Sequence, residues 1–195
     1  MKKVISLLCA FLLAFQLTGC AAITDPEAPV DAFCQAMQEL NVTNMAACTK
    51  DGDIAVLVGG PLEPFFEKCA AHMTYTIKEV TVTDNRATVE VEFWHVNSAL
   101  VIADAFAELI GDGSGLLLAM GGADPELLTE YLVTIMLKNA DSYTSPTAST
   151  TVFFPCVRTD WGWKISSMPD AVNTVLTCDL EGAFESFSDS FSGGY

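Results

Sequence analysis

The sequence predicts an α+β domain in which helices pack on an antiparallel sheet. Three observations lead to this prediction: amphipathic helical segments near residues 30 and 65, two pairs of β-type segments joined by turn sequences, and two apolar helical segments between these pairs. The chain of 195 residues is long enough to bury one sizeable core. We therefore expect a single domain whose sheet is built from two hairpins, with a helical insertion between them.

The first predicted element is a helix that opens at Pro29. Its apolar residues recur at helical spacing and would share one face: Val30, Phe33, Cys34, Met37 and Leu40. Asn41 can cap a second, short helix that runs through Cys48. Residues 49–61 are ambiguous between strand and loop, and residues 61–72 form a third predicted helix.

A β-hairpin is predicted next, over residues 74–96. Its arms are rich in Thr, Val, Tyr and Phe, and the turn Asp84-Asn85-Arg86 tolerates the positive φ of a tight hairpin. In the second arm Val and Phe alternate with Glu and Trp, so one face belongs to a core. The first arm changes phase near Lys78-Glu79, which predicts a β-bulge that bends the sheet.

The helical insertion is predicted from two apolar segments. Residues 98–110 form a helix with a narrow polar stripe at Asp104 and Glu108, and a second helix runs from Pro125, preceded by the cap residue Asp124, to about residue 140. If the domain does not bury both helices completely, an exposed apolar face marks a partner surface.

The chain then returns to the sheet. Residues 148–158 and 163–167 are predicted to be the strands of a second hairpin, and Pro169 begins a last helix that runs toward Phe187. The Ser- and Gly-rich residues 188–195 are expected to be a disordered tail.

The first 20 residues have the pattern of a bacterial lipoprotein signal. Two lysines begin it, an apolar run of about 12 residues follows, and Leu17-Thr18-Gly19-Cys20 forms a lipobox. The apolar run is shorter than the roughly 20 residues that span a bilayer as a helix. We therefore expect residues 1–19 to be a cleaved signal peptide and Cys20 to carry a diacylglyceryl group with fatty acids such as palmitate. Residues 20–28 would be the tether to the extracytoplasmic face of the cell membrane, and an ordinary secretory signal with an incidental Cys is the alternative.

The chain is strongly acidic. Its net charge is −16, and removal of the signal with its two lysines leaves 7 basic and 25 acidic residues, a net charge of −18. Such a surface repels nucleic-acid phosphates and anionic lipid headgroups. We therefore expect no nucleic-acid partner, and we expect the lipid alone to attach the protein to the membrane.

Five cysteines remain when Cys9 leaves with the signal and Cys20 is lipidated: Cys34, Cys48, Cys69, Cys156 and Cys178. Outside the cytoplasm an odd set allows at most two disulfides and one free thiol, and the sequence leaves the pairing open. No CxxC or Cys/His spacing is typical of zinc, and no GxSxG, HExxH or phosphate-loop motif is present, so no metal or cofactor is expected.

Several segments, in their order along the chain, carry a family resemblance. They are the lipobox, Pro29-Val30-Asp31-Ala32-Phe33, residues 81–91, Trp163-Lys164-Ile165 and the closing segment 173–184. In this order they resemble small lipoproteins of unknown function from Gram-positive bacteria that have a nuclear transport factor 2-like (cystatin-like α+β cone) domain. The resemblance implies a curved sheet that wraps helices around a concave pocket over residues 29–187, often with a dimer on the sheet's outer face. It implies no catalytic motif.

Two classes of function remain open. The favoured class is a lipid-anchored extracytoplasmic binding or accessory module of the cell envelope, with a second copy of the chain or another envelope protein as its partner. The alternative is a small pocket enzyme of isomerase or hydrolase type that uses His95 with Glu92 or Asp104, because enzymes that resemble this fold move protons with Asp or His in the cone. His95 shares a face with Val91 and Phe93, so a core histidine is the simpler interpretation. A hydrogen bond from His95 to a carboxylate would favour the enzyme.

Aromatic residues are the remaining candidates for ligand contact. Trp94 could stack on a sugar or a peptide, and Tyr75 is the second candidate. The other tryptophans, Trp161 and Trp163, are explained as well by turn packing and core filling.

Overall fold

The computed structural model describes residues 25–52, 54, 60–111, 125–140, 142–143, 145–183 and 185–186. Its helices and strands are, in chain order, α2 (Glu27–Gln38), α3 (Val42–Cys48), η2 (Gly60–Leu62), α4 (Glu63–His72), β1 (Thr74–Thr83), β2 (Arg86–His95), α5 (Ser98–Gly111), α7 (Pro125–Ala140), β3 (Ala148–Thr159), β4 (Gly162–Ile165) and α8 (Ala171–Leu176). The predicted signal peptide, Cys20, most of the tether, the cap residue Asp124 and the predicted tail lie outside the described residues.

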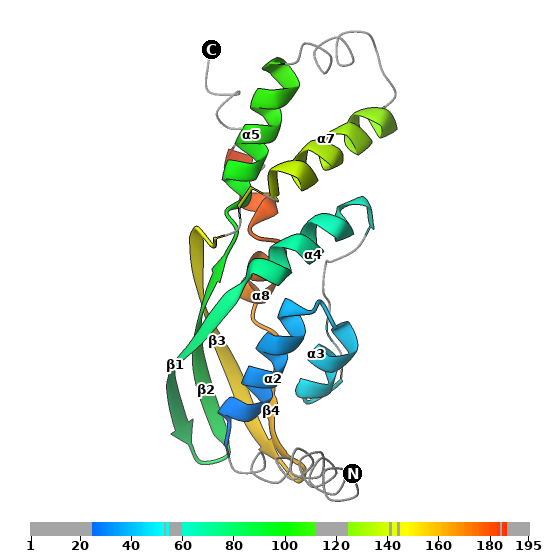
Figure 1. The fold of residues 1–195 in the computed structure, drawn as a ribbon. Coiled ribbons are helices and arrows are strands. Elements are labelled where there is room, and N and C mark those ends of the chain that lie inside the picture. Colours follow the sequence, from blue (N-terminus) through cyan, green and yellow to red (C-terminus); the bar gives the residue numbers. More distant parts are fainter. Residues whose placement is uncertain are drawn as a thin grey trace, which may run out of the picture.

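The four strands form one antiparallel sheet in the order β1-β2-β3-β4, which confirms the predicted α+β class. The two predicted hairpins are present, and the first one turns at Asp84 with a φ of 54°. The predicted bulge is also confirmed, because the register between β1 and β2 shifts between Ile77 and Glu79. Figure 1 shows the long β1, β2 and β3 strands bending together.

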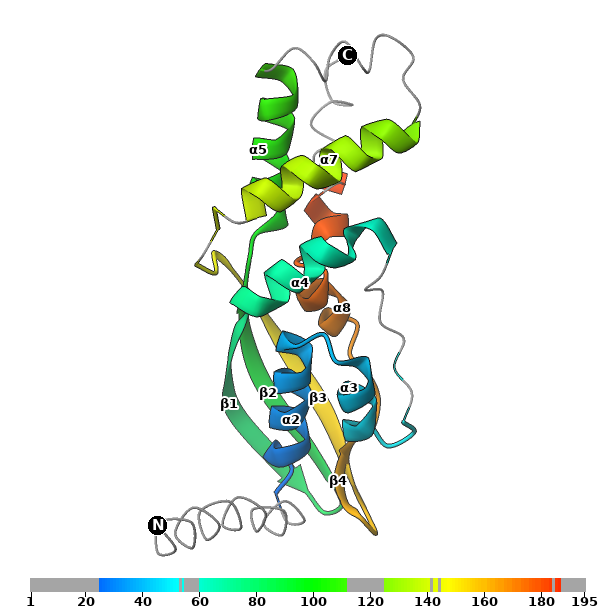
Figure 2. The same ribbon diagram turned by 45° about the vertical axis from the view of Figure 1, so that its right-hand side comes forward.

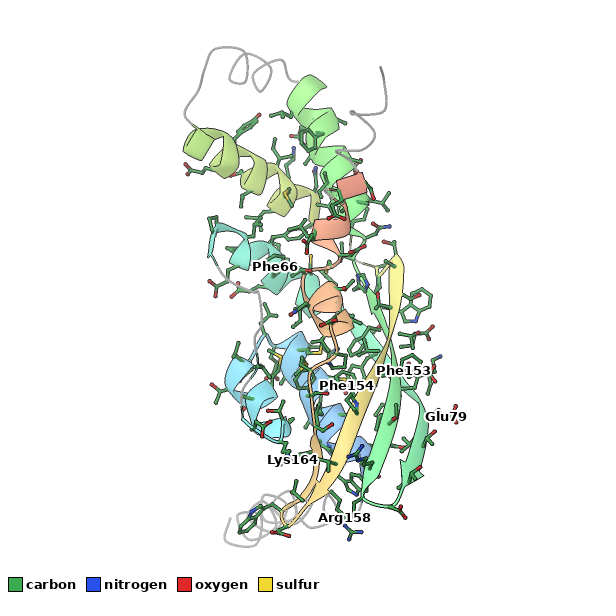
Figure 3. All side chains as sticks on the ribbon, turned by 180° about the vertical axis from the view of Figure 1, so that it is seen from behind. Phe66, Glu79, Phe153, Phe154, Arg158 and Lys164 are labelled. Carbon is green, nitrogen blue, oxygen red and sulfur yellow. The ribbon has the colours of Figure 1, made fainter. Side chains whose placement is uncertain are left out.

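One face of the sheet is covered by helices. In β2 the residues at alternate positions, Val89, Val91 and Phe93, are fully buried under α2 and α8. Phe33 of α2 meets Phe154 of β3 edge to face, with their ring centroids 5.6 Å apart. Figure 2 shows α2 and α3 lying on the same side of the bent sheet. The opposite face of the sheet carries no helix of the described residues, and Figure 3 shows Phe153 and Glu79 pointing away from the helices while Phe154 points toward them.

The insertion builds a second core at one end of the sheet. His95, the last residue of β2, pairs with Ala148, the first residue of β3, so the helices between them lie beyond the same sheet end. Figure 1 shows α5 and α7 at this end, with α4 next to α7 and α8 farther along the inner face of the sheet. The buried residues of this second core come from α4, the link between β2 and α5, α5, α7 and the segment that follows α8: Phe65, Phe66, Cys69, Val96, Val101, Ile102, Ala105, Leu109, Ile135, Met136, Ala140, Cys178, Leu180 and Ala183.

Two predicted helix boundaries are wrong. The first helix begins at Glu27, before Pro29, because the Asp25 carboxylate accepts from the Glu27 backbone N–H. The last helix does not continue to Phe187, because α8 ends at Leu176 in a Schellman motif. Cys178 has a φ of 52°, and its backbone N–H donates to Val175 O. The backbone N–H of Asp179 donates to Thr174 O at 2.7 Å. Residues 180–183 are helical again.

None of the helices in the described part of the chain combines the length and the apolar character that a bilayer crossing requires.

Candidate functional site

His95 lies in the core at the end of β2, with 2% of its surface exposed. Its Nδ1 lies 2.9 Å from Val96 O, and its Nε2 lies 3.0 Å from Thr150 Oγ1. A carbonyl oxygen can only accept, so Nδ1 carries a proton, and in the neutral ring Nε2 accepts from the Thr150 hydroxyl. Both ring nitrogens are therefore held by uncharged groups, and neither partner is a carboxylate.

The two carboxylates named as partners of His95 are engaged elsewhere. Glu92 lies on the opposite face of β2, where it forms an ion pair of 2.7 Å with Lys78, and the hydrogen bond from Lys78 lowers the pKa of Glu92. Asp104 lies on an exposed position of α5 and accepts a hydrogen bond from the Tyr143 hydroxyl. That hydrogen bond, with some burial, raises the pKa of Tyr143 to about 12. The structure therefore does not bring the predicted catalytic candidates together.

The two aromatic candidates lie on opposite faces of the sheet. Trp94 is 42% exposed on the outer face, which the described helices leave uncovered. Tyr75 pairs with Phe93 on the inner face, and its hydroxyl donates to Asp31 Oδ1 at 2.7 Å. Burial and this hydrogen bond raise the pKa of Tyr75 to about 12. The hydroxyl of Tyr75 thus ties β1 to α2, and the two rings do not share a binding surface.

A groove that the sequence analysis missed lies beside the second core. Its volume is about 680 Å³, and it runs between the start of α4 and the segment around the end of α8. Leu62 and Phe66 supply its apolar side, and Figure 3 labels Phe66 on α4. Leu180 is a further apolar lining residue, and the rest are polar, acidic or small: Asp170, Asn173, Thr174, Thr177, Asp179, Glu181, Gly182 and Glu185. The described lining contains no Lys or Arg.

The groove exists because the last helix breaks. The positive φ values of Cys178 and Asp179 turn the chain, so residues 179–182 lie across from α4 and do not extend α8. One polar atom in this region, Asn173 Oδ1, is buried and has no hydrogen-bond partner among the described residues. The sequence signal that could have indicated the groove is the concentration of acids at 170, 179, 181 and 185 around an expected helix, and it is weak because solvated helix faces carry the same pattern.

Metal chemistry has no site in the part of the chain that the structure describes. No three His, Cys, Asp or Glu side chains of those residues gather in an arrangement that could hold an ion. The five cysteines that follow the predicted lipidation site are all buried, and each has a free thiol in the structure. Burial raises the pKa of Cys156 to about 12 and also raises that of Cys34, so neither has the thiolate character of a nucleophile.

No protein-family model, no curated protein and no solved structure matches this chain. The chemistry of the site is therefore inferred from its own geometry. A histidine held by a hydroxyl and a carbonyl can fix the end of the sheet, and a groove with an apolar side and a polar rim can hold a ligand.

Proposed function

We propose that the protein is a lipid-anchored binding or accessory module on the extracytoplasmic face of a bacterial cell membrane, and that it catalyses no reaction of its own. The anchor would be a diacylglyceryl group on Cys20, since the lipobox ends there and the apolar run before it is too short to span a bilayer. A second copy of the chain or another envelope protein would be its partner.

The observation that carries the non-enzymatic half of this proposal is the hydrogen bonding of His95. A proton-transferring histidine needs a nitrogen that can reach a substrate, commonly with a carboxylate to orient the ring. Here Val96 O and Thr150 Oγ1 take both nitrogens, and 98% of the residue's surface is covered. This supports a structural role, and it disfavours the alternative of a pocket enzyme that uses His95 with Glu92 or Asp104.

We also propose that the domain is a nuclear transport factor 2-like cone. The order of elements supports this assignment, because the three helices α2, α3 and α4 precede a long hairpin, a helical insertion and a second hairpin. The bulge in β1 supports it further, since a bulge bends a sheet around the helices on its inner face.

The groove between α4 and the segment after α8 is the proposed binding surface, and crosslinking tests whether a ligand or partner occupies it. A photo-crosslinking amino acid replaces Thr174, which lines the groove, in the full-length protein in living cells. The matched control places it at Trp161, which is 88% exposed in the turn between β3 and β4. Figure 1 shows the turn between β3 and β4 at the end of the sheet away from α4.

A discrete adduct from position 174 that is absent from position 161 is the expected result. Its mass would distinguish a second copy of the chain from a different envelope protein. Identical adduct patterns from both positions, or no adduct from position 174, would contradict binding in the groove.

A further inference from the structure

Two cysteines from distant parts of the chain meet in the second core. Cys69 lies on α4 and Cys178 lies two residues beyond α8, and both belong to the same buried cluster, with 1% and 2% of their surfaces exposed. Phe66, one turn before Cys69 on α4, lines the groove together with Thr177 and Asp179, the two neighbours of Cys178. Both cysteines are free thiols in the structure, and the nearby Cys69 thiol, together with burial, raises the pKa of Cys178. In the sequence they are separated by all four strands of the sheet and by α5, α7 and α8.

The other cysteines have different surroundings. Cys48 Sγ lies 3.3 Å from Asn44 O, four residues earlier on the same helix, and Cys156 Sγ lies 3.7 Å from Phe154 O on the same strand. These two thiols therefore have backbone acceptors on their own elements. Cys34 lies with them in the first core, the buried cluster between the inner face of the sheet and helices α2, α3 and α8.

The backbone at Cys178 is also unusual for a cysteine. It occupies the left-handed position of a Schellman motif, where glycine is the usual residue because a side chain there is strained. A non-glycine residue persists in this conformation when its surroundings hold it there. Here the surroundings are the apolar core that contains Cys69.

We propose that Cys69 and Cys178 form a disulfide that ties α4 to the segment after α8. This inference rests on the proposed extracytoplasmic location, because disulfides form and persist outside the reducing cytoplasm. The bridge would close a loop of roughly 110 residues that contains all four strands of the sheet and the insertion. It would also fix the chain turn that forms the groove.

The oxidant is a disulfide-containing molecule of the envelope or medium, such as an oxidised thiol–disulfide oxidoreductase or glutathione disulfide. One cysteine thiolate attacks the oxidant's disulfide and releases one thiol, and the second cysteine thiolate attacks the mixed disulfide and releases the other. The S–S bond forms as two electrons pass to the oxidant, and the two protons leave with its thiols or with water. Because both sulfurs are buried in the fold, the exchange takes place before α4 and the C-terminal segment close together. The finished bridge should then resist reductants until the protein unfolds.

Trypsin makes the pairing directly readable. Cleavage after Lys and Arg places Cys69 in peptide 69–78, Cys156 in peptide 139–158 and Cys178 in peptide 165–195. Full-length protein, exported with its own signal and extracted in detergent, is denatured with an alkylating agent present and digested without reductant. We expect peptides 69–78 and 165–195 to be joined, and peptide 139–158 to be alkylated. Alkylation of both Cys69 and Cys178 in the exported protein would overturn the proposal.

Variants provide an independent readout. Cys69→Ser and Cys178→Gly should each remove the joined peptides and lower the Tm by roughly 5–15 °C. The double variant should lose no more than about the same amount, because either single change already removes the bridge. Cys178→Gly is the safer of the two for folding, because glycine suits the left-handed position. Cys156→Ser, a change at an equally buried thiol, should keep the joined peptides. Equal Tm values for the parent with and without complete reduction would contradict a stabilising bridge.

The same digest separates this proposal from the proposed function. Peptide 20–50 reports whether the protein reached the envelope and was lipidated on Cys20. If it did not, the full chain is refolded from denaturant with glutathione disulfide. Joined peptides after refolding would support the pairing of Cys69 with Cys178 even if the proposed extracytoplasmic location is wrong. Alkylation of both cysteines after refolding would refute the pairing.

Discussion

Replacement of Trp163 is the most direct test of the first core. Trp163 lies in β4 opposite Arg158, is 5% exposed and packs in the cluster under the sheet. Truncation of a buried Trp to Ala usually costs about 3–5 kcal/mol, from lost apolar burial and the cavity that remains. With an m-value of about 2 kcal/mol/M in urea, the unfolding midpoint of Trp163→Ala should fall by roughly 1.5–2.5 M. Far-UV circular dichroism of the detergent-extracted protein follows the transition without relying on tryptophan fluorescence.

A second substitution at the same position separates packing from hydrogen bonding. The indole Nε1 of Trp163 is buried and has no hydrogen-bond partner among the described residues. A buried donor without a partner costs about 1–3 kcal/mol, which Trp163→Phe removes along with part of the ring. The two effects oppose each other, so Trp163→Phe should cost less than half as much as Trp163→Ala.

The neighbouring tryptophan supplies the control. Trp161 is only two residues away and is 88% exposed, so Trp161→Ala should change the free energy of unfolding by no more than about 0.5 kcal/mol. Equal midpoints for Trp163→Ala and Trp161→Ala would refute the placement of β4 against the core.

Two further substitutions test the polar contacts of the sheet. His95→Ala should lower the free energy of unfolding by about 2–3 kcal/mol, because the packing of the ring and its hydrogen bond with Thr150 are lost. The crosslink from position 174 should persist in this variant. A His95→Ala protein of normal stability that loses binding or a reaction would contradict the structural role of His95. Tyr75→Phe should flatten the loss of stability between pH 10 and 12. The folded-state pKa of Tyr75 is raised to about 12 from 10, so its contribution is complete below pH 10 and is lost as the pH rises through 12; unchanged pH profiles for parent and Tyr75→Phe would contradict the hydrogen bond to Asp31.

The parts of the fold that could be predicted from the sequence are those with a local cause. The alternation in β2 placed His95 on the buried face and Trp94 on the exposed face, and both positions are confirmed. The phase change in β1 predicted the bulge near Lys78-Glu79, and the register shifts between Ile77 and Glu79, because a strand keeps its inward face only by inserting a residue.

The parts that could not be predicted depend on contacts between distant segments. The end of α8 has no Gly or Pro to mark it, since a cysteine occupies the left-handed position and tertiary packing holds it there. The groove follows from this turn and was therefore missed. Asp104 and Glu92 bind Tyr143 and Lys78, which lie on other segments of the chain. The site with His95 that the family resemblance suggested is therefore not assembled by the fold.

Lipidation of Cys20 is the central claim about where and how this protein works, and the mass of peptide 20–50 tests it most directly. The full-length protein is expressed in a lipoprotein-processing bacterium, extracted in detergent and digested with trypsin, and Cys9→Ala and Cys20→Ala variants are treated in the same way. For the parent and Cys9→Ala we predict a peptide that begins at Cys20 and carries a diacylglyceryl thioether, and for Cys20→Ala we predict no lipid and no detergent-phase partitioning. An unmodified Cys20 in the parent, or a lipid-modified Cys20→Ala protein, would contradict the account.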